Sequence, residues 1–336
     1  MTRTNRQWRL AERPSGLDFE RCFRMVEEPS PEPVADGEIL VSNLVFSMDP
    51  TQRGWMARDT YLPAVKIGAV MRSGAGGRVV ESRHPNFAVG DLVVGMFGWQ
   101  DYALVNANAS PPTKVTPGVP IELAMSVLGV TGITAYFGLL DVGRPKQGET
   151  VVVSGAAGAT GSVVGQIARI HGCRVVGIAG GKDKCAWLVG EARFDAAIDY
   201  KTEDVSARLR ALCPAGIDVY FDNVGGDILD AALAQLAMRG RVVLCGAIAT
   251  YNDAELRPGP KHYLNLLLKR GRMEGFLLLD YMQRAPEAVK ELWAWVQRGD
   301  LVHMVDVQRG FENAPRTLKR LFAGENRGKQ LLRVAD

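Results

Sequence analysis

The stretch Val151-Val-Val-Ser-Gly155-Ala-Ala-Gly158-Ala-Thr-Gly161-Ser-Val-Val-Gly165 determines how this chain folds. Its first residues are a short apolar run that predicts a buried strand over Thr150–Ser154. Apolar residues at helical spacing then predict a helix over Gly161–His171. A glycine loop between a strand and a helix lets the backbone approach a phosphate, and the helix N-terminus adds N–H donors. The stretch therefore predicts a dinucleotide-binding βαβ unit.

The loop departs from the plain GxGxxG pattern, because Ala156 and Ala157 precede Gly158 and give GxxGxxG. Glycines alone are weak evidence, but here they lie between a strand and a helix, with further βα units behind them. The alternative interpretation is tight packing of helix on strand without a ligand.

Strands and helices alternate through the residues that follow. The pattern predicts strands over 174–179, 196–199, 217–221, 241–245 and 272–279, and helices over 123–140, 182–191, 227–238, 262–269 and 286–297. Unbroken Val/Ile strands that alternate with helices indicate a parallel sheet covered on both faces. We therefore expect an α/β, doubly wound (Rossmann) domain with six parallel strands.

Residues 1–120 show a different sequence pattern, in which short apolar runs are broken by Gly, Pro and Asn. Runs over 38–45, 77–80, 91–94 and 102–105 predict a β-rich, GroES-like, partly open barrel. The tail returns to β-like runs with one helix near Ala314–Phe322, so we assign it to the first domain. The expected domains are 1–121 with 300–336, and 122–299. We expect the active site in the cleft between them.

Composition excludes several protein classes. Hydrophobic residues make up 47%, charged residues 23%, and the net charge is +3, from 40 basic and 37 acidic residues. These values argue against a disordered chain and give no case for a nucleic-acid or membrane partner. The N-terminus is polar and unlike a secretory signal. The five cysteines and four histidines lack metal-ligand spacing, so we expect reduced thiols, a cytoplasmic location and no metal.

The end of the second predicted strand bears on the choice of nicotinamide cofactor. An NAD site usually has Asp or Glu there to bind the ribose 2′-hydroxyl. This chain instead has Gly180 and Gly181, followed by Lys182 and Lys184. Cations would meet a 2′-phosphate, so the sequence favours NADPH. Asp183 leaves NADH open, and solvated lysines at a helix start are the other interpretation.

Seven strings carry a resemblance to a known family. They are Met48-Asp-Pro50, Gly132-Ile-Thr-Ala-Tyr-Phe-Gly138, Ala156-Ala-Gly-Ala-Thr-Gly-Ser162, Phe221-Asp-Asn-Val-Gly-Gly226, Cys245-Gly-Ala-Ile-Ala-Thr-Tyr-Asn252, Arg272-Met-Glu-Gly-Phe276 and Gly324-Glu-Asn-Arg-Gly-Lys329. Over nearly its whole length the chain resembles the zinc-independent medium-chain dehydrogenases/reductases. Within them it is similar to the leukotriene B4 12-hydroxydehydrogenase, or prostaglandin reductase, group, which includes alkenal double-bond reductases and curcumin reductases. The resemblance implies NADPH-dependent reduction of the C=C bond of enones and enals, and a homodimer.

The resemblance also implies a set of cofactor contacts. They are Gly158, Ala159, Thr160 and Gly161 under the pyrophosphate; Lys184 and Tyr200 at the 2′-phosphate; Asn223 beside the cofactor; Cys245, Gly246, Ala247, Ile248 and Tyr251 in a neighbouring loop; Phe276, Leu277 and Leu278 at the carboxamide; and Asn326 from the tail. Residue reasoning supports two of them. Asn223 and Cys245 follow predicted parallel strands, at the edge where ligands bind. A turn-forming Asn and a small buried thiol are the alternatives.

The proton donor is less well defined. Hydride transfer to the β-carbon of an enone leaves an enolate, which needs a stabilising donor and a proton. The group often has Tyr where this chain has Leu268, and again where it has Thr51. With no metal, the available donor is a phenol or a ribose hydroxyl. The candidate tyrosines are Tyr263 and Tyr61, and for each the alternative role is packing.

Two other functions stay open. A quinone reductase on the same scaffold would share the glycine loop. An NADPH-binding protein without turnover would fit the absence of a tyrosine at position 268.

Overall fold

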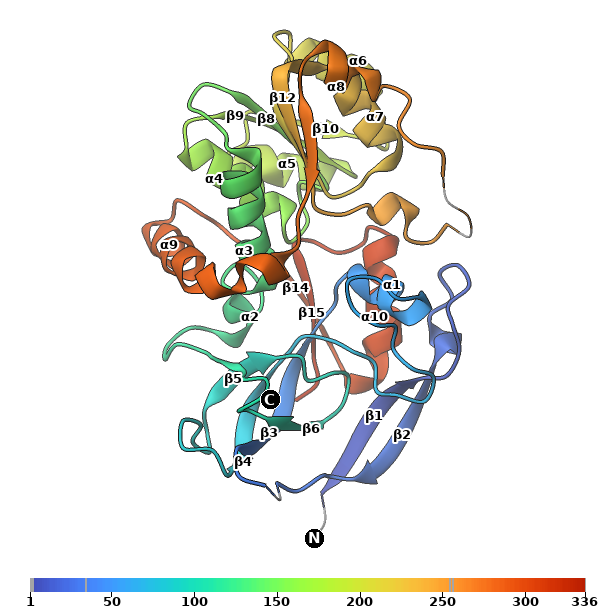
Figure 1. Ribbon diagram of the computed structural model, residues 1–336, viewed down its shortest axis with the longest axis vertical. Helices are drawn as coiled ribbons and strands as arrows, with labels where there is room; N and C mark the ends of the chain where they lie inside the picture. Colours follow the sequence, from blue (N-terminus) through green and yellow to red (C-terminus); the bar gives the residue numbers. More distant parts are fainter. Residues whose placement is uncertain (1–2, 34, 254, 256, 336) are drawn as a thin grey trace. The chain divides into compact units, whose positions relative to one another are not determined.

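The computed structural model describes residues 3–33, 35–253, 255 and 257–335 (Figure 1). It divides into two compact units: residues up to Met125 together with those from Val305 form the first, and Ser126–Met304 form the second. The expected boundaries, 121/122 and 299/300, lie four and five residues before these divisions. No helix among the described residues is long and apolar enough to cross a membrane.

The second unit is built on a parallel sheet of six strands in the order β10-β9-β8-β11-β12-β13. Its strands are β8 (Thr150–Ser154), β9 (Arg174–Ala179), β10 (Ala196–Asp199), β11 (Ile217–Asp222), β12 (Leu236–Leu244) and β13 (Arg272–Gly275). In chain order this is 3-2-1-4-5-6, the doubly wound order with its reversal between β8 and β11. The predicted α/β fold class is confirmed.

Helices precede, connect and follow these strands. They are α3 (Val130–Phe137), α4 (Gly161–Ile170), α5 (Lys182–Gly190), α6 (Val205–Leu212), α7 (Gly226–Ala234), α8 (Leu264–Leu268) and α9 (Ala285–Arg298). Short 3₁₀ or π turns are η2 (Gly138–Gly143), η3 (Ile248–Thr250) and η4 (Leu278–Arg284). Buried Val152, Val176, Ile198 and Tyr220 from four strands form part of one core cluster. Burial on this scale supplies the main driving force for folding.

Four predicted elements differ from the observed bounds by more than two residues, and one of them, the strand expected over 241–245, already begins at Leu236. The helix expected over 227–238 ends at Ala234, because β12 already starts at Leu236 and Arg239 then takes a left-handed φ of 61°. The strand expected over 272–279 ends at Gly275, where η4 soon follows. The helix expected over 123–140 is divided among α2, α3 and η2.

The first unit has a mostly antiparallel sheet in the order β14-β15-β3-β4-β5-β7, with β6 also paired to β3, and a separate ladder of β1 and β2. Its strands are β1 (Thr4–Leu10), β2 (Phe23–Pro29), β3 (Glu38–Ser47), β4 (Ala75–Ser82), β5 (Leu92–Gly95), β6 (Tyr102–Asn106), β7 (Thr113–Lys114), β14 (Val305–Arg309) and β15 (Lys329–Arg333). Its helical segments are η1 (Glu20–Cys22), α1 (Thr51–Ala57), α2 (Ile121–Ala124), η5 (Phe311–Asn313) and α10 (Ala314–Phe322). The tail strand β15 pairs with β3, so the C-terminal segment completes this sheet.

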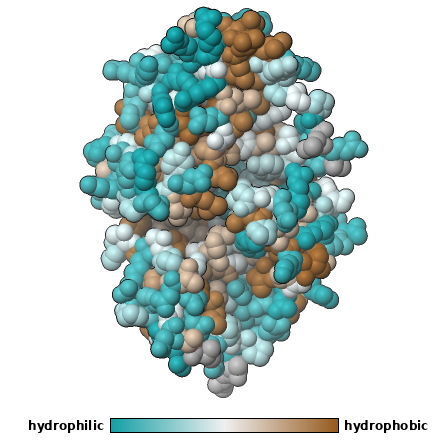
Figure 2. All heavy atoms as spheres, in the orientation of Figure 1, coloured by the Kyte–Doolittle hydropathy of each residue, from teal (hydrophilic) through white to brown (hydrophobic). Residues whose placement is uncertain are grey.

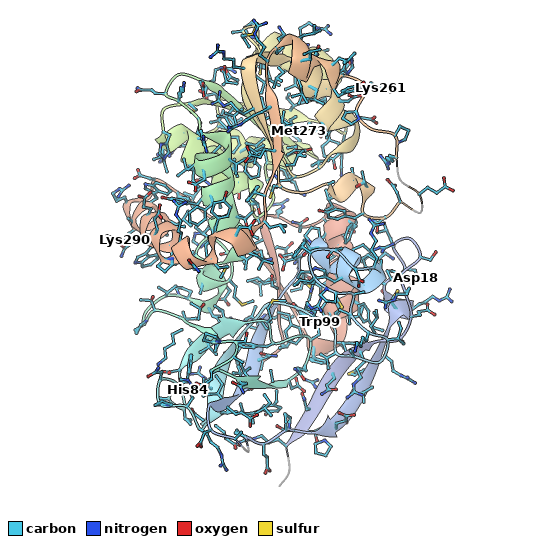
Figure 3. The ribbon with its side chains drawn as sticks, in the orientation of Figure 1. Asp18, His84, Trp99, Lys261, Met273 and Lys290 are labelled. Carbon is cyan, nitrogen blue, oxygen red and sulfur yellow. The ribbon has the colours of Figure 1, made fainter. Side chains whose placement is uncertain are left out.

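Large aromatic residues fill the core of the first unit. Trp99, labelled in Figure 3, is fully buried and its ring tilts against Phe23. Met48 and Trp55 are buried in the same cluster. These side chains therefore pack the core, where each contributes a few kcal/mol (about 1.5–3 per large apolar side chain).

Candidate functional site

The glycine loop leaves the carboxyl end of β8 through a tight turn. Gly155 has a φ of +57°, a conformation that side chains disfavour. The Ala156 N–H then donates to the Ile178 carbonyl of β9 at 3.0 Å, which ties the loop to the next strand. A Cβ on Gly161 would lie 2.4 Å from the Gly155 carbonyl oxygen and 2.9 Å from Ala156 Cα. Only glycine therefore allows α4 to start this close to the loop.

The start of α4 presents unused hydrogen-bond donors. Within the second unit, the backbone N–H groups of Ala159, Thr160 and Gly161 have no acceptor among the described residues. Gly158, Ala159 and Thr160 are partly exposed, and the first turn of α4 carries no acidic side chain. Free N–H groups and a positive helix end form an anion site, so this segment could hold a pyrophosphate.

Asn223 lies beside this loop. Its Nδ2 donates to the Ser154 carbonyl at 2.7 Å, and its backbone N–H donates to Ser154 Oγ at 2.9 Å. A Cβ built on Gly155 would lie 3.4 Å from Asn223 Cβ. The ends of β8 and β11, which flank the reversal of strand order, are thus joined where a doubly wound sheet binds ligands.

The loop after β12 comes to the same edge. The N–H groups of Cys245 and Gly246 donate to the Asp222 carbonyl, at 2.9 and 3.0 Å. The Ile248 N–H donates to the Asn223 carbonyl at 3.3 Å, and the Ala247 N–H donates to the Tyr251 hydroxyl at 3.1 Å. These bonds bring the segment 245–251 next to Asn223.

The acid groups of this loop stay protonated. Burial raises the pKa of the Cys245 thiol to about 12, and the Asp222 carboxylate adds to the shift. Burial also raises the pKa of Tyr251. Neither side chain is therefore an anionic nucleophile near neutral pH.

The far end of the edge, at β9 and β10, gathers the residues expected at the 2′-phosphate. A Cβ built on Gly180 would lie 2.8 Å from the hydroxyl oxygen of Tyr200, so this ring covers the glycine at the end of β9. Asp199 accepts the Gly181 N–H at 2.8 Å, a bond that holds the pKa of its carboxyl below the ordinary value. Asp199 is therefore occupied by backbone donors. Lys184 lies in the first turn of α5.

Phe276 anchors the segment after β13. Its ring makes edge contacts with Phe221 and Tyr281, at centroid distances of 6.4 and 6.2 Å. A Cβ on Gly138 would lie 2.4 Å from Phe276 Cζ, so the ring fills the space above that glycine. Leu277 is exposed and Leu278 half-buried directly after it. The backbone of 276–278 is thus fixed by packing on η2 and β11.

Tyr263 does not join these residues. It directly precedes α8, and its side chain is 57% exposed. Asn265 Nδ2 donates to the Leu233 carbonyl at the end of α7, and the Arg239 N–H donates to the Lys269 carbonyl. These contacts lie at the amino edge of the sheet, because α8 leads into β13. Its neighbours His262 and Asn265 bond to α7, and the role of Tyr263 as a proton donor stays a prediction.

Two expected site residues belong to the first unit. Tyr61 is 42% exposed, and its ring makes an edge contact with Trp55 at 6.2 Å. Asn326 is half-buried in the loop before β15, and its Nδ2 donates to the Gly328 carbonyl at 2.9 Å. Tyr61 lies on the loop after α1, and Asn326 lies on the C-terminal tail.

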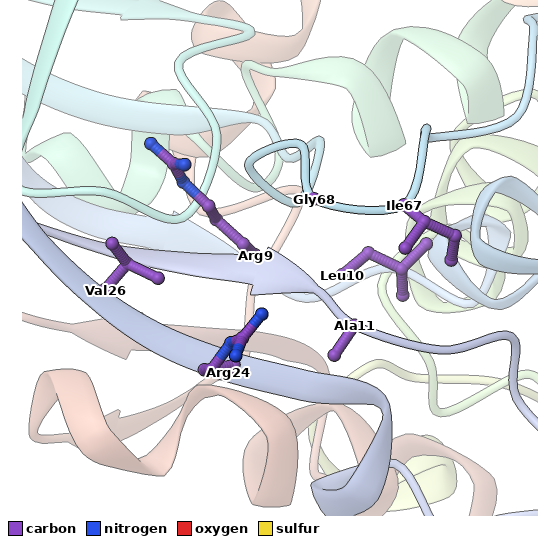
Figure 4. A pocket seen from close by; sticks show the side chains of 7 residues that line it. All are labelled: Arg9, Leu10, Ala11, Arg24, Val26, Ile67 and Gly68. Carbon is purple, nitrogen blue, oxygen red and sulfur yellow. The ribbon is translucent and has the colours of Figure 1, made fainter.

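A small pocket also lies in the first unit, between β1, β2 and the loop at Gly68 (Figure 4). Its volume is about 130 Å³, below the range of roughly 300–1,000 Å³ typical of ligand sites. Arg9, on its wall, already pairs with Glu28 at 2.6 Å. We assign no function to this pocket.

Sequence reasoning missed Ser154 and Asp222 as parts of the site. Both are polar residues that end buried strands, and both are at most 1% exposed. A polar residue at the carboxyl end of an apolar strand is the signal that could have identified them.

Comparisons with known proteins assign the chain to a family. Residues 6–113 match the family described as the N-terminal domain of oxidoreductase, and residues 159–298 match the one described as zinc-binding dehydrogenase. The NADPH-dependent curcumin reductase of Escherichia coli is 41% identical over 98% of this chain and 97% of its own length. This chain belongs to the medium-chain dehydrogenase/reductase family.

Further members of the medium-chain dehydrogenase/reductase family match at similar levels. The NADP(+)-dependent 2-alkenal reductase of Nicotiana tabacum is 40% identical over 90% of this chain and 89% of its own. The crystal structure of CurA in complex with NADPH from Vibrio vulnificus superposes with a TM-score of 0.93, at 39% identity, over 98% of this chain and 99% of that one. Within the described residues, no cluster of three or more His, Cys, Asp or Glu side chains could hold a metal ion.

Proposed function

We propose that this chain uses NADPH to reduce the C=C bond of α,β-unsaturated ketones and aldehydes. The carboxyl edge of the second unit's sheet carries the proposal. It combines the N–H groups at the start of α4 with a strand end that has Gly180 and Gly181 in place of Asp or Glu, and whose neighbour Asp199 already accepts the Gly181 N–H. The named relatives, a curcumin reductase and a 2-alkenal reductase, support the same chemistry.

When bound, NADPH supplies a hydride for the electron-poor β-carbon of the enone. The residues of this chain then hold and orient the two reactants. Ala159, Thr160 and Gly161 would donate to the pyrophosphate, and Lys184 and Tyr200 would bind the 2′-phosphate. The segments 245–251 and 276–278 would enclose the nicotinamide end, and Asn326 would reach it from the tail. Fixed placement of both reactants accounts for much of the rate gain in such a transfer.

The enolate left by hydride transfer needs a proton at its α-carbon. We propose Tyr61, which is exposed on the loop after α1, as the donor; Tyr263 and a ribose hydroxyl of the cofactor are the alternatives. Tyr61→Phe removes the hydroxyl and keeps the ring contact with Trp55. We expect kcat to fall by about 100-fold, because general-acid groups contribute at least that much, while the Kd for NADPH stays unchanged. An unchanged kcat would rule out Tyr61.

The direct test of the activity is loss of NADPH absorbance with four substrates: a linear enal, an aryl enone, a quinone and a saturated ketone. We expect turnover of the enal and the enone with NADPH, and much less with NADH. Turnover of the quinone alone would favour a quinone reductase. Tight NADPH binding without turnover of any substrate would favour a binding protein.

We also propose that the chain forms a homodimer. β13 is the last strand of its sheet, so its outer backbone groups are open to a further strand. The neighbouring α8 exposes Leu264, Leu267 and Leu268 by 55%, 73% and 64%. Figure 2 shows a hydrophobic patch where Figure 1 has α8. Light scattering should give twice the 36.5 kDa chain mass, and Leu267→Glu should halve it. A 36.5 kDa particle for the unaltered chain would exclude the dimer.

The proposed location is the cytoplasm. All five cysteines are free thiols, as is usual in a reducing compartment. Cell fractionation followed by immunoblotting checks this assignment, and recovery in a membrane or extracellular fraction would contradict it.

A further inference from the structure

We infer that Asp222 is a positioning residue for the nucleotide site, which acts through Ser154 to fix Asn223 and the start of the glycine loop. The inference rests on the proposed cofactor site and adds two residues to it. It stands on a buried hydrogen-bond network that joins the ends of three strands.

Asp222 is the centre of this network. Its side chain is buried, and its Oδ1 accepts four hydrogen bonds: from Ser154 Oγ at 2.8 Å and from the Tyr220 hydroxyl and the N–H groups of Val224 and Gly225 at 3.0 Å. Its backbone carbonyl accepts the N–H groups of Cys245 and Gly246. One residue therefore holds the carboxyl ends of β8, β11 and β12 together.

The second carboxyl oxygen makes the arrangement unusual. Asp222 Oδ2 is buried and has no hydrogen-bond partner among the residues that the structure describes. An unpaired buried oxygen lowers the stability of the fold, so stability alone does not account for a carboxyl at this position. The N–H groups of Val224 and Gly225, which lead into α7, compensate part of its charge. The Asp222 carboxylate instead holds four donors around one oxygen. Hydrogen bonds to a carboxylate are stronger than bonds between neutral groups.

Ser154 connects this hydrogen-bond network to the glycine loop. Because its hydroxyl donates to Asp222, the lone pairs of Ser154 Oγ accept the Asn223 N–H at 2.9 Å. Asn223 Nδ2 returns a bond to the Ser154 carbonyl at 2.7 Å. Gly155, where the chain turns into the glycine loop, is the next residue. Loosening Ser154 would therefore release both Asn223 and the start of the loop.

Tyr220 provides a matched control. Its hydroxyl donates to the same Asp222 oxygen, lies in hydrogen-bond reach of Ser154, and is fully buried. Tyr220→Phe removes one donor from the network but keeps the bonds from Ser154 to Asp222 and to Asn223. A network that serves only stability predicts similar effects for Tyr220→Phe and Ser154→Ala. A positioning role predicts that only the latter changes cofactor binding.

The test measures the Kd for NADPH by fluorescence titration and the melting temperature for the unaltered chain, Ser154→Ala, Asp222→Asn and Tyr220→Phe. We expect Ser154→Ala and Asp222→Asn to weaken binding by about tenfold, the effect of one lost charge-assisted hydrogen bond. Tyr220→Phe should lower the melting temperature but leave the Kd within about twofold, a change of less than 0.5 kcal/mol.

Two results would overturn the inference: native affinity in both Ser154→Ala and Asp222→Asn, or an equal loss of affinity in Tyr220→Phe. Failure of the unaltered chain to bind NADPH would instead refute the proposed function, and this inference with it. Ser154→Ala removes a single oxygen, so it remains informative if Asp222→Asn does not fold.

Discussion

Gly161→Ala should reduce the affinity for NADPH by about 100-fold, or roughly 2.7 kcal/mol. The new Cβ would lie 2.4 Å from the Gly155 carbonyl oxygen and 2.9 Å from Ala156 Cα, both backbone atoms that cannot rotate away. The start of α4 must then move outward, and the free N–H groups of Ala159, Thr160 and Gly161 lose their common direction. Isothermal titration with NADPH measures the effect.

Gly190→Ala is the control for this substitution. Gly190 also lies in a helix, at the end of α5, and a Cβ there meets nothing within 4 Å. It should bind NADPH normally and gain slightly in stability, since alanine favours helix over glycine by about 1 kcal/mol. Native affinity in Gly161→Ala would show that the loop does not hold the pyrophosphate.

Lys184→Ala should remove most of the preference for NADPH over NADH. We expect the Kd for NADPH to rise by about 10- to 100-fold, because a hydrogen bond to a charged group contributes roughly 1.5–3 kcal/mol. The Kd for NADH should not change, since NADH lacks the 2′-phosphate. Titration of both nucleotides gives the ratio directly.

Lys290→Ala controls for the loss of one positive charge. Lys290 is exposed on α9, which packs against α3 and η4 rather than against β9 or β10 (Figure 3). It should leave both affinities unchanged. Equal losses for NADH and NADPH in Lys184→Ala would place the lysine away from the 2′-phosphate.

Local sequence patterns predicted the second unit well. The bounds of β9 and β10 match the predicted strands, because strands buried on both faces are continuous apolar runs that end abruptly. The ladder of β1 and β2 was not predicted, since Gln7 and Arg9 interrupt the apolar residues of β1. The helix α1 was also missed. Pro50 is its N-cap, and a proline at the start of a helix was the available signal.

The site was predictable only where its residues are neighbours in sequence. The glycine loop is local, so its glycines and its position between strand and helix were enough. The bond between Ser154 and Asp222 spans 68 residues and depends on two strands lying side by side. Tyr263 was chosen only because it lies close in sequence to position 268, and sequence spacing does not reveal that Asn265 of α8 bonds to the end of α7.

The measurement that tests the central claim most directly follows a deuterium label. The enzyme is incubated with NADPH deuterated at C4 of the nicotinamide and an aryl enone, and the product is analysed by NMR and mass spectrometry. Our account predicts a saturated ketone with one deuterium on the former β-carbon and a solvent proton on the α-carbon. Deuterium on the carbonyl carbon, in an allylic alcohol, would contradict it.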